Sequence, residues 1–346
     1  MPICDPSKGE AKSARFCVSH ATDTLMISKR FAWLAALALI LSTADCLAAD
    51  KLRLSIATGG TGGVYYPYGG GIARVLSSHV PGMQVTAEVT GGSVDNVKLV
   101  GAGDADIGFS TIDSAVDGVK GAGAYKDTGA QKIQAIAVLY DSFVHIVTRA
   151  DSKIAKVAQM RGKRLSVGSA GSSTEAIADR LLEAAGLRPD KDVTRDNLGV
   201  SESVAALKDG KIDAMFWIGG LPTSAITDLV TTGNVKIVFV PAGDLMPKLN
   251  SKYPNLYRSF TLPKTIYAGT PADVPGVGVA NILFVGADMK AETVDKILKG
   301  LFDNLADVQK IHPDAKTLTL AGAAAKTAIP FHPAATAFYK ARGAIK

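Results

Sequence analysis

Two stretches of this 346-residue chain follow one pattern, and this internal repeat restricts the possible folds more than any other feature. The first stretch is Leu52–Phe109 and the second is Arg164–Phe216. LRLSIATGGTGG in the first matches RLSVGSAGSST in the second, and VKLVGAGDADIGF matches VAALKDGKIDAMF. Each pair joins a short apolar strand to a loop of small residues, and later an apolar helix to a glycine, an aspartate and another strand.

The repeat predicts a fold with two similar α/β lobes. Each stretch reads as strand, loop, helix, strand, helix, strand, which favours parallel sheets with right-handed crossovers. Two such lobes predict a clamp with a ligand cleft between them, while ordinary doubly wound α/β structure is the alternative. Val144–Arg149 is the expected first crossing between the lobes, and Ala280–Val285 is expected to lie beyond the return crossing.

The remaining segments carry weaker patterns. Two separate strands are predicted on either side of residues 138–143, and two helices are predicted near the C-terminus. One proline- and glycine-rich segment is predicted to wrap irregularly over the surface. The predicted strands are Ile133–Ala137 and Val144–Val147. The predicted helices are Val294–Leu305 and Thr336–Arg342, and the irregular segment is Gly243–Pro275.

The first fifty residues read as a targeting segment. Lys29 and Arg30 precede an apolar core of about eleven residues, followed by small residues, as in a secretory signal. We therefore expect a start at Met26, cleavage near Ala48 or Ala49, and a periplasmic location. Residues 1–25 read as an over-extended start or an unusual leader. The apolar core is too short for an ordinary transmembrane helix, and no later stretch approaches that length.

Cysteine content and charge exclude several classes of function. The cysteines at positions 4, 17 and 46 all precede the predicted cleavage site, so the mature chain would hold no thiol for a disulfide, a metal or a nucleophile. Asp45 before Cys46 also fits lipoprotein processing poorly. The net charge is +6, without a run of Lys/Arg and interleaved aromatics, which argues against nucleic-acid binding.

The chain contains no recognisable catalytic or metal motif. His145, His312 and His332 lack metal-ligand spacing and read as surface or core histidines. Neither GxSxG nor HExxH occurs, and no pair of acids stands out. We therefore expect no metal, no cofactor and no enzymatic activity.

The loop after the first strand of each repeat is the main candidate for ligand binding. Glycines there allow a ligand close to the backbone, and a following helix would direct its N–H groups and positive dipole end at an anion. The first loop lacks both the Walker lysine and GxGxxG spacing, which disfavours a nucleotide. Two such loops face to face favour a small dianion or a zwitterion with a carboxylate. The candidates are Thr58, Thr61, Gly62, Gly63, Val64, Tyr65 and Tyr66, and then Ser169, Gly171, Ser172, Ser173 and Thr174.

Further candidates follow other strands, at the sheet edge where open α/β folds bind ligands. They are Ser93 and Asn96, Ser110, Thr111 and Asp113, and Trp217, Gly219, Gly220 and Pro222. Structural alternatives stay open for all these loops. The glycine loop could be a plain turn with its tyrosines in the core, and Ser93, Asn96, Ser172 or Ser173 could cap helices. Asp113 could receive a ligand ammonium or cap a helix over Ser114–Val119.

The whole pattern resembles the TAXI family of solute receptors for TRAP transporters. The resemblance is carried by IATGGTGGVYYPYGGGIARVLS, VTAEVTGGSVDNVKLVGAGDADIGF, VGSAGSSTE, VSESVAALKDGKIDAMFWIGGLPT and IPFHPAATAFYK, which cover nearly all of Leu52–Tyr339. Ala335 stands where the family's pattern has glycine. The resemblance implies the bilobed type II periplasmic binding fold, with residues 50–146 and about 265–346 in lobe one and 147–264 in lobe two.

The resemblance also implies a function. The chain would bind a small organic anion by hinge closure, such as glutamate, 2-oxoglutarate or another dicarboxylate, and deliver it as a monomer to a TRAP permease. The ligand-facing loops would be Thr61–Tyr65, Ser110–Asp113, Ser169–Thr174 and Gly219–Pro222, with Tyr267 in addition. Two alternatives are a binding protein for an ABC importer of nitrate-, sulfonate- or thiamine-like compounds and an enzyme on the same fold. The thiol-free mature chain argues against a porphobilinogen-type deaminase, which attaches its cofactor through cysteine.

Overall fold

The computed structural model describes residues 51–232 and 235–345. The predicted signal segment and all three cysteines lie outside the described residues. The described residues belong to one compact unit, residues 50–346. The description below concerns this unit only.

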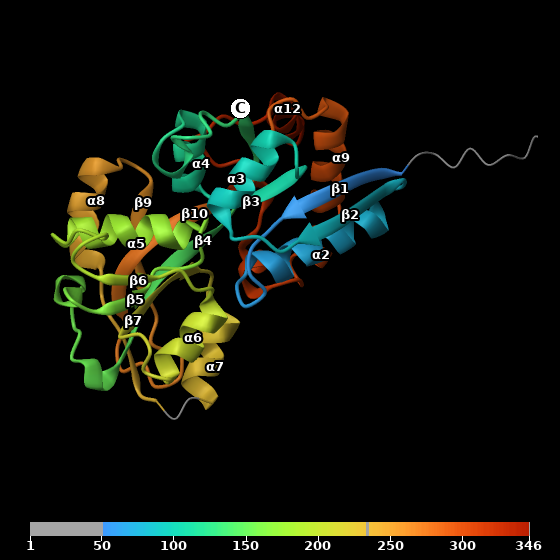
Figure 1. Cartoon of the computed structure of the whole chain (residues 1–346). Coiled ribbons are helices and arrows are strands. Elements are labelled where there is room, and N and C mark those ends of the chain that lie inside the picture. The colour runs from blue at the N-terminus through green and yellow to red at the C-terminus, as the bar shows by residue number, and fades with distance from the viewer. Residues whose placement is uncertain (1–50, 233–234, 346) are drawn as a thin grey trace, which may run out of the picture. The chain divides into compact units, whose positions relative to one another are not determined.

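The described strands form one mixed sheet in the order β2-β1-β3-β10-β4-β7-β5-β6, with β8 paired to β4 and β9 paired to β10 (Figure 1). An open α/β sheet of this kind confirms the predicted fold class. The strands are β1 (Leu52–Ala57), β2 (Met83–Glu88), β3 (Ile107–Thr111), β4 (Ile133–Arg149), β5 (Arg164–Ser166), β6 (Thr194–Asp196), β7 (Ala214–Gly219), β8 (Ile237–Phe239), β9 (Tyr257–Leu262) and β10 (Val274–Gly286).

Helices connect the strands and cover the sheet. The α-helices are α2 (Tyr65–His79), α3 (Ser93–Ala102), α4 (Ile112–Lys120), α5 (Ser173–Ala184), α6 (Val200–Lys208), α7 (Ser224–Thr232), α8 (Met246–Lys252), α9 (Ala291–Phe302), α10 (Leu305–Val308), α11 (Leu320–Ala323) and α12 (Pro333–Ala341). Short 3₁₀ turns lie at Gly123–Tyr125, Ala150–Ser152, Val157–Met160, Gly243–Leu245 and Pro313–Thr317.

The two stretches of the internal repeat fold into units with the same order of strands and helices. The first unit is β1-α2-β2-α3-β3 and the second unit is β5-α5-β6-α6-β7, and in each the first strand pairs in parallel with the other two. The matching aspartates play the same role, because Asp106 accepts a hydrogen bond from the Ser55 N–H and Asp213 accepts one from the Arg164 N–H. Asp106 thus ties the start of β3 to the middle of β1, and Asp213 ties the start of β7 to the start of β5.

The two units are joined by two long strands, which Figure 1 shows as β4 and β10. The sequence pattern predicts two strands between Ile133 and Val147, but the structure has one continuous strand of 17 residues. The polar residues in its middle stay in the ladder because their side chains have partners: Ser142 accepts from Asn281, and Asp141 pairs with Arg258. β4 pairs with β10 up to Phe143 and with β7 from Phe143 onward, so it leads from the first unit to the second.

β10 leads back to the first unit. It pairs with β9 over Val274–Val279 and with β3 over Asn281–Val285. The exact lobe limits given above, residues 50–146 with about 265–346 and residues 147–264, stay a prediction.

The C-terminal third departs from the sequence pattern in one place. The segment 243–275, predicted as irregular, contains α8 and β9, because Leu249, Tyr257 and Leu262 are buried against the core. The two helices expected near the C-terminus are present as α9 and α12. α12 begins at Pro333, and the ring of His332 accepts a hydrogen bond from the Ala334 N–H at 3.2 Å.

A buried ionic cluster joins α4, α5 and β9. One guanidinium nitrogen of Arg180 lies 3.0 Å from the Asp113 carboxylate and donates to the Tyr257 hydroxyl at 2.6 Å. The other contacts Asp117, and the Tyr253 ring lies 4.2 Å from the guanidinium carbon. Since Asp113 is fully buried, its charge depends on Arg180.

We predict that Arg180→Met lowers the free energy of unfolding by about 3–5 kcal/mol, because it leaves a buried carboxylate without its cation. The control is Arg342→Met, which removes an exposed pair with Asp303 and is expected to change stability by no more than about 1 kcal/mol. Urea unfolding of both variants measures this difference. Equal losses in the two variants would contradict the assigned role of Arg180.

His145 on β4 is a core histidine, one of the two alternatives that the sequence leaves open. Its ring lies between the Phe143 carbonyl and the Tyr267 hydroxyl, 3.0 Å from each. Burial lowers the pKa of His145 to about 4. The folded protein therefore holds a neutral imidazole over a range of pH in which the unfolded chain binds a proton.

We predict that the free energy of unfolding falls as the pH drops from about 6.5 to about 4, with a contribution from His145 of up to about 3 kcal/mol. In this window the unfolded state binds more protons than the folded state, so acid favours unfolding. Urea unfolding between pH 7.5 and 4.5 should show a flatter profile for His145→Phe than for the unaltered chain. His79→Gln, at an exposed histidine, should keep the original slope.

Candidate functional site

Four helix N-termini of the described chain open onto one pocket. These are the N-termini of α2 and α3 from the first unit and of α5 and α6 from the second. Their N-cap residues, Val64, Gly92, Ser172 and Gly199, all line the pocket. The arrangement follows from the repeat, because each unit places two helix starts at the carboxyl ends of its parallel strands. The pocket, including its open mouth, encloses about 550 Å³ between atoms.

The pocket is lined by glycines and by hydroxyl-bearing, aromatic and aliphatic side chains, and no ionic side chain lies among its described lining. Its described lining is Gly59, Gly60, Gly63, Val64, Tyr65, Gly91, Gly92, Ser93, Tyr140, Ser142, Ser169, Ser172, Ser173, Thr174, Gly199, Val200, Trp217, Ile218 and Gly219. A ligand there meets backbone amides, hydroxyls and the aromatic side chains of Tyr65, Tyr140 and Trp217. Because the first backbone N–H groups of a helix have no partner within the helix, they are the strongest donors available.

An asparagine at the centre of the sheet organises the polar side of the pocket. Asn281 on β10 accepts a hydrogen bond from the Tyr65 hydroxyl at 2.5 Å and donates to Ser142 at 2.8 Å. Tyr65 also lies 3.3 Å from the hydroxyl of Ser93. This chain links α2, α3, β4 and β10, so the first unit and the joining strands share one network.

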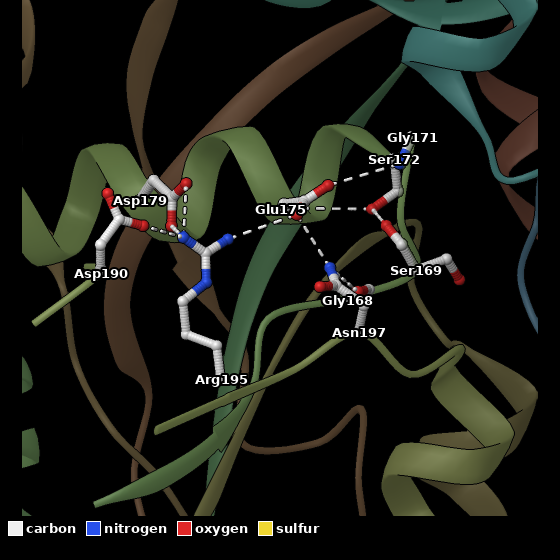
Figure 2. Close-up of polar contacts among 9 residues, drawn as sticks. All are labelled: Gly168, Ser169, Gly171, Ser172, Glu175, Asp179, Asp190, Arg195 and Asn197. Atoms are coloured by element: carbon white, nitrogen blue, oxygen red, sulfur yellow. Dashed lines mark hydrogen bonds and ion pairs between the residues drawn. The ribbon is translucent and has the colours of Figure 1, made fainter. Parts of the chain in front are cut away.

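The N-terminus of α5 is held by a second network (Figure 2). Ser172 caps the helix, its hydroxyl accepting from the Glu175 N–H at 3.2 Å, as one of the sequence alternatives proposes. The Glu175 carboxylate turns to the side chains of Arg195 and Asn197, at 3.3 and 2.9 Å. Arg195 also pairs with Asp179 and Asp190. Burial, with Glu175 and Asp190 adding to it, raises the pKa of Asp179 to about 6.

The two units touch each other at the rim of the pocket. The Asp95 N–H donates to the Gly171 carbonyl at 3.0 Å, and the Ser224 hydroxyl donates to the Gly62 carbonyl at 3.3 Å. A Cβ on Gly63 would lie 2.8 Å from the ring of Trp217. The Gly59–Gly63 loop therefore packs closely against the second unit, and a side chain at position 63 would overlap Trp217.

Ten of the sequence-predicted residues line the pocket, and both units contribute to them. They are Gly63, Val64, Tyr65, Ser93, Ser169, Ser172, Ser173, Thr174, Trp217 and Gly219. That they bind a ligand stays a prediction.

The other predicted residues lie outside the lining, and most have structural partners. Asn96 donates to the Thr58 and Phe109 carbonyls, and Ser110 donates to the Thr111 carbonyl. Asp113 is held by Arg180 and Tyr257, so it neither faces the pocket nor caps a helix: α4 begins at Ile112. Tyr267 accepts from the Thr223 N–H in the core of the second unit. The remaining residues outside the lining are Thr58, Thr61, Gly62, Tyr66, Thr111, Gly171, Gly220 and Pro222.

Sequence reasoning missed several lining residues, among them Ile218 on β7. Tyr140 and Ser142 lie in the middle of β4, where no turn or glycine marks them. Gly199 and Val200 start α6, which corresponds to α3 in the repeat. In the repeat, Gly199 and Val200 occupy the positions that Gly92 and Ser93 occupy in the first unit, and this correspondence is a sequence signal that predicts them.

A larger groove adjoins this pocket and shares Tyr140 with it. It is lined by residues of β4, β9 and β10 and of the C-terminal segment, including Asp141, Arg258 and Lys326. Neither the Gly59–Gly63 loop nor the Ser169–Thr174 loop lines it. The helix starts converge instead on the smaller pocket, which is the better candidate for binding an anion.

Comparison with known proteins gives the family. A family model described as the NMT1-like family matches residues 56–343, which is most of the chain. The chain belongs to the NMT1-like family. The sequence-based resemblance to solute receptors is thereby supported at the level of a binding-protein family, while membership of the TAXI family is not shown.

Solved structures of periplasmic binding proteins are similar to this member of the NMT1-like family. The periplasmic binding protein BugD matches at 18% identity with a TM-score of 0.49, over 84% of this chain and 93% of its own. The aliphatic sulphonate binding protein SsuA from Escherichia coli matches at 17% identity with a TM-score of 0.44, over 77% of this chain and 74% of its own. An ancestral arginine-binding protein matches at 15% identity with a TM-score of 0.47, over 76% of this chain and 98% of its own.

Two further findings concern the part of the chain that the structure describes. None of its helices combines the length and the apolar character needed to cross a bilayer. No group of three or more histidine, cysteine, aspartate or glutamate side chains is arranged there to hold a metal ion.

We predict that Asn96 and Ser110, both fully buried, differ sharply in their effect on stability. Asn96→Ala leaves two backbone carbonyls and the Thr90 hydroxyl without their partner, so unfolding should become easier by about 2–5 kcal/mol. Ser110→Ala removes one local contact and should cost less than about 1.5 kcal/mol. Thermal or urea unfolding checks both values, and a smaller loss at Asn96 would refute its role in holding β1 and β3 together.

Proposed function

We propose that this protein is an extracytoplasmic solute-binding protein of a transporter and that its pocket binds a small organic anion. The observation that carries the proposal is the convergence of four helix N-termini on one pocket lined by no charged side chain among the described residues. Each helix start offers N–H donors and the positive end of a dipole. An anion is the ligand that such a site stabilises best.

The binding mechanism follows from the division of the lining between two units. A ligand that receives hydrogen bonds from α2 and α3 on one side and from α5 and α6 on the other holds the units together. Only contacts made in the closed state and absent from the open state can shift the population toward closure. The rim contacts Asp95–Gly171 and Ser224–Gly62 belong to this closed arrangement.

For the membrane partner, the family match supports the ABC-importer alternative better than the TRAP permease. The chain is matched by the NMT1-like family. We therefore propose a permease of an ABC importer for nitrate-, sulfonate- or thiamine-like compounds as the partner. A neighbouring gene for a large multi-span TRAP permease would favour the TAXI reading instead.

The chemistry of the pocket also supports binding rather than catalysis. Its hydroxyls come from serine, threonine and tyrosine, and no histidine or carboxylate lies among its described lining to activate them. Burial raises the pKa of Tyr65 above its ordinary value, so this residue acts as a hydrogen-bond donor rather than as a base.

We predict that Ser173→Pro weakens anion binding at least tenfold with little loss of stability. Ser173 is the first residue of α5, where proline is tolerated, and Ser172 before it has the extended backbone that proline requires. The substitution removes one N–H that faces the pocket. Calorimetry with succinate, glutarate, 2-oxoglutarate and ethanesulfonate measures the affinities.

Two control variants separate the backbone from the side chain. Ser173→Ala removes the hydroxyl and keeps the N–H, so it should bind more tightly than Ser173→Pro. Ala291→Pro places proline at the first position of α9, away from the pocket, and should leave affinity unchanged. Equal affinities for Ser173→Pro and Ser173→Ala would show that the helix N-terminus of α5 does not hold the anion.

A further inference from the structure

Asp314 lies against Gly220 beside the pocket, and its carboxylate accepts a hydrogen bond from the Leu221 N–H. Three further acids belong to the first turns of the helices around the pocket. The Glu175 carboxylate turns to Arg195 and Asn197, as Figure 2 shows. The Asp95 carboxylate lies against the backbone of Gly91 and Gly171, so closely that a Cβ on either glycine would overlap it. Glu202 on α6 is exposed to solvent, and its carboxylate lies close to Gly199, the N-cap residue of that helix. None of these three side chains is part of the pocket lining.

A cationic group in this pocket would therefore be poorly stabilised. An ammonium buried beside four helix N-termini faces the positive end of each dipole. Without a carboxylate in the lining, its charge has no counterion, and desolvation of an unpaired charge is costly. The same groups favour an anion, so the charge pattern discriminates between a carboxylate and an amino acid that carries one.

Tyr140 adds an independent sign of a ligand. Its side chain is buried beside Tyr65 and Ser142, and on β4 it lines both the pocket and the larger groove. Its hydroxyl makes no hydrogen bond within the described residues. Burial raises the pKa of Tyr140 well above its ordinary value, so the hydroxyl stays protonated. A buried donor without a partner is costly, and a ligand acceptor in the pocket would satisfy it.

We infer that the pocket takes a compact anion that carries hydrogen-bond acceptors and no ammonium, and that the Tyr140 hydroxyl donates to it. This inference rests on the proposed binding function and narrows its ligand class. Of the ligands that the sequence pattern suggests, it selects oxo acids, simple dicarboxylates and sulfonates over glutamate.

The ligand class is tested with pairs of probes that differ by one amine. Calorimetry compares glutarate with L-glutamate, succinate with L-aspartate, and ethanesulfonate with 2-aminoethanesulfonate. In every pair that binds, the probe without the amine should bind at least tenfold more tightly. Equal or tighter binding of an amine-bearing probe overturns this inference and leaves the proposed function standing. No binding by any probe overturns both.

The role of Tyr140 is tested with two matched substitutions. Tyr140→Phe removes the hydroxyl and keeps the ring, and it should weaken binding of the best probe at least tenfold. Tyr68→Phe is the control, because the Tyr68 hydroxyl is also buried without a partner among the described residues but its side chain does not line the pocket. Thermal unfolding of both variants verifies the fold. Equal affinity for the two variants overturns the assignment of Tyr140.

Discussion

The structure depends on one constraint: the unpaired N–H groups at helix starts must find partners outside the helix. Parallel strands place these starts at one edge of the sheet, and the repeat supplies two from each unit. Serine caps α5, but no side chain caps α2, α3 or α6. The donors that remain face a shared pocket, which explains why this protein can bind an anion without an arginine or lysine in the lining.

The rest of the fold holds these helix starts in place. Asn96 fastens the carboxyl ends of β1 and β3, and Asn281 connects α2 to the joining strands β4 and β10. On the other side of the units, Arg180 joins α4, α5 and β9. These buried polar residues fix positions and orientations. The ligand-facing groups, by contrast, are backbone amides and hydroxyls whose placement depends on this frame.

The fold and half of the site were predictable because both depend on local patterns. The period-2 strands, the helical spacing and the turn glycines are written in short windows, so the repeat, its two loops and the capping role of Ser172 follow from residues near in sequence. The candidates Asn96, Asp113 and Tyr267 instead have partners 13 to 144 residues away. No local pattern indicates that their side chains are already engaged.

The sequence by itself determined two α/β units, each with a small-residue loop before a helix. That follows because strand and helix periodicity and glycine conformations are local properties of the chain. Only the tertiary structure decided which polar residues face the pocket and which are buried in the frame. Tyr140 and Ser142 enter the site because β4 runs unbroken between the units, and Asp113 leaves it because Arg180 approaches from α5. The physical reason is that a buried polar group is defined by its partner, and the partner is brought by folding.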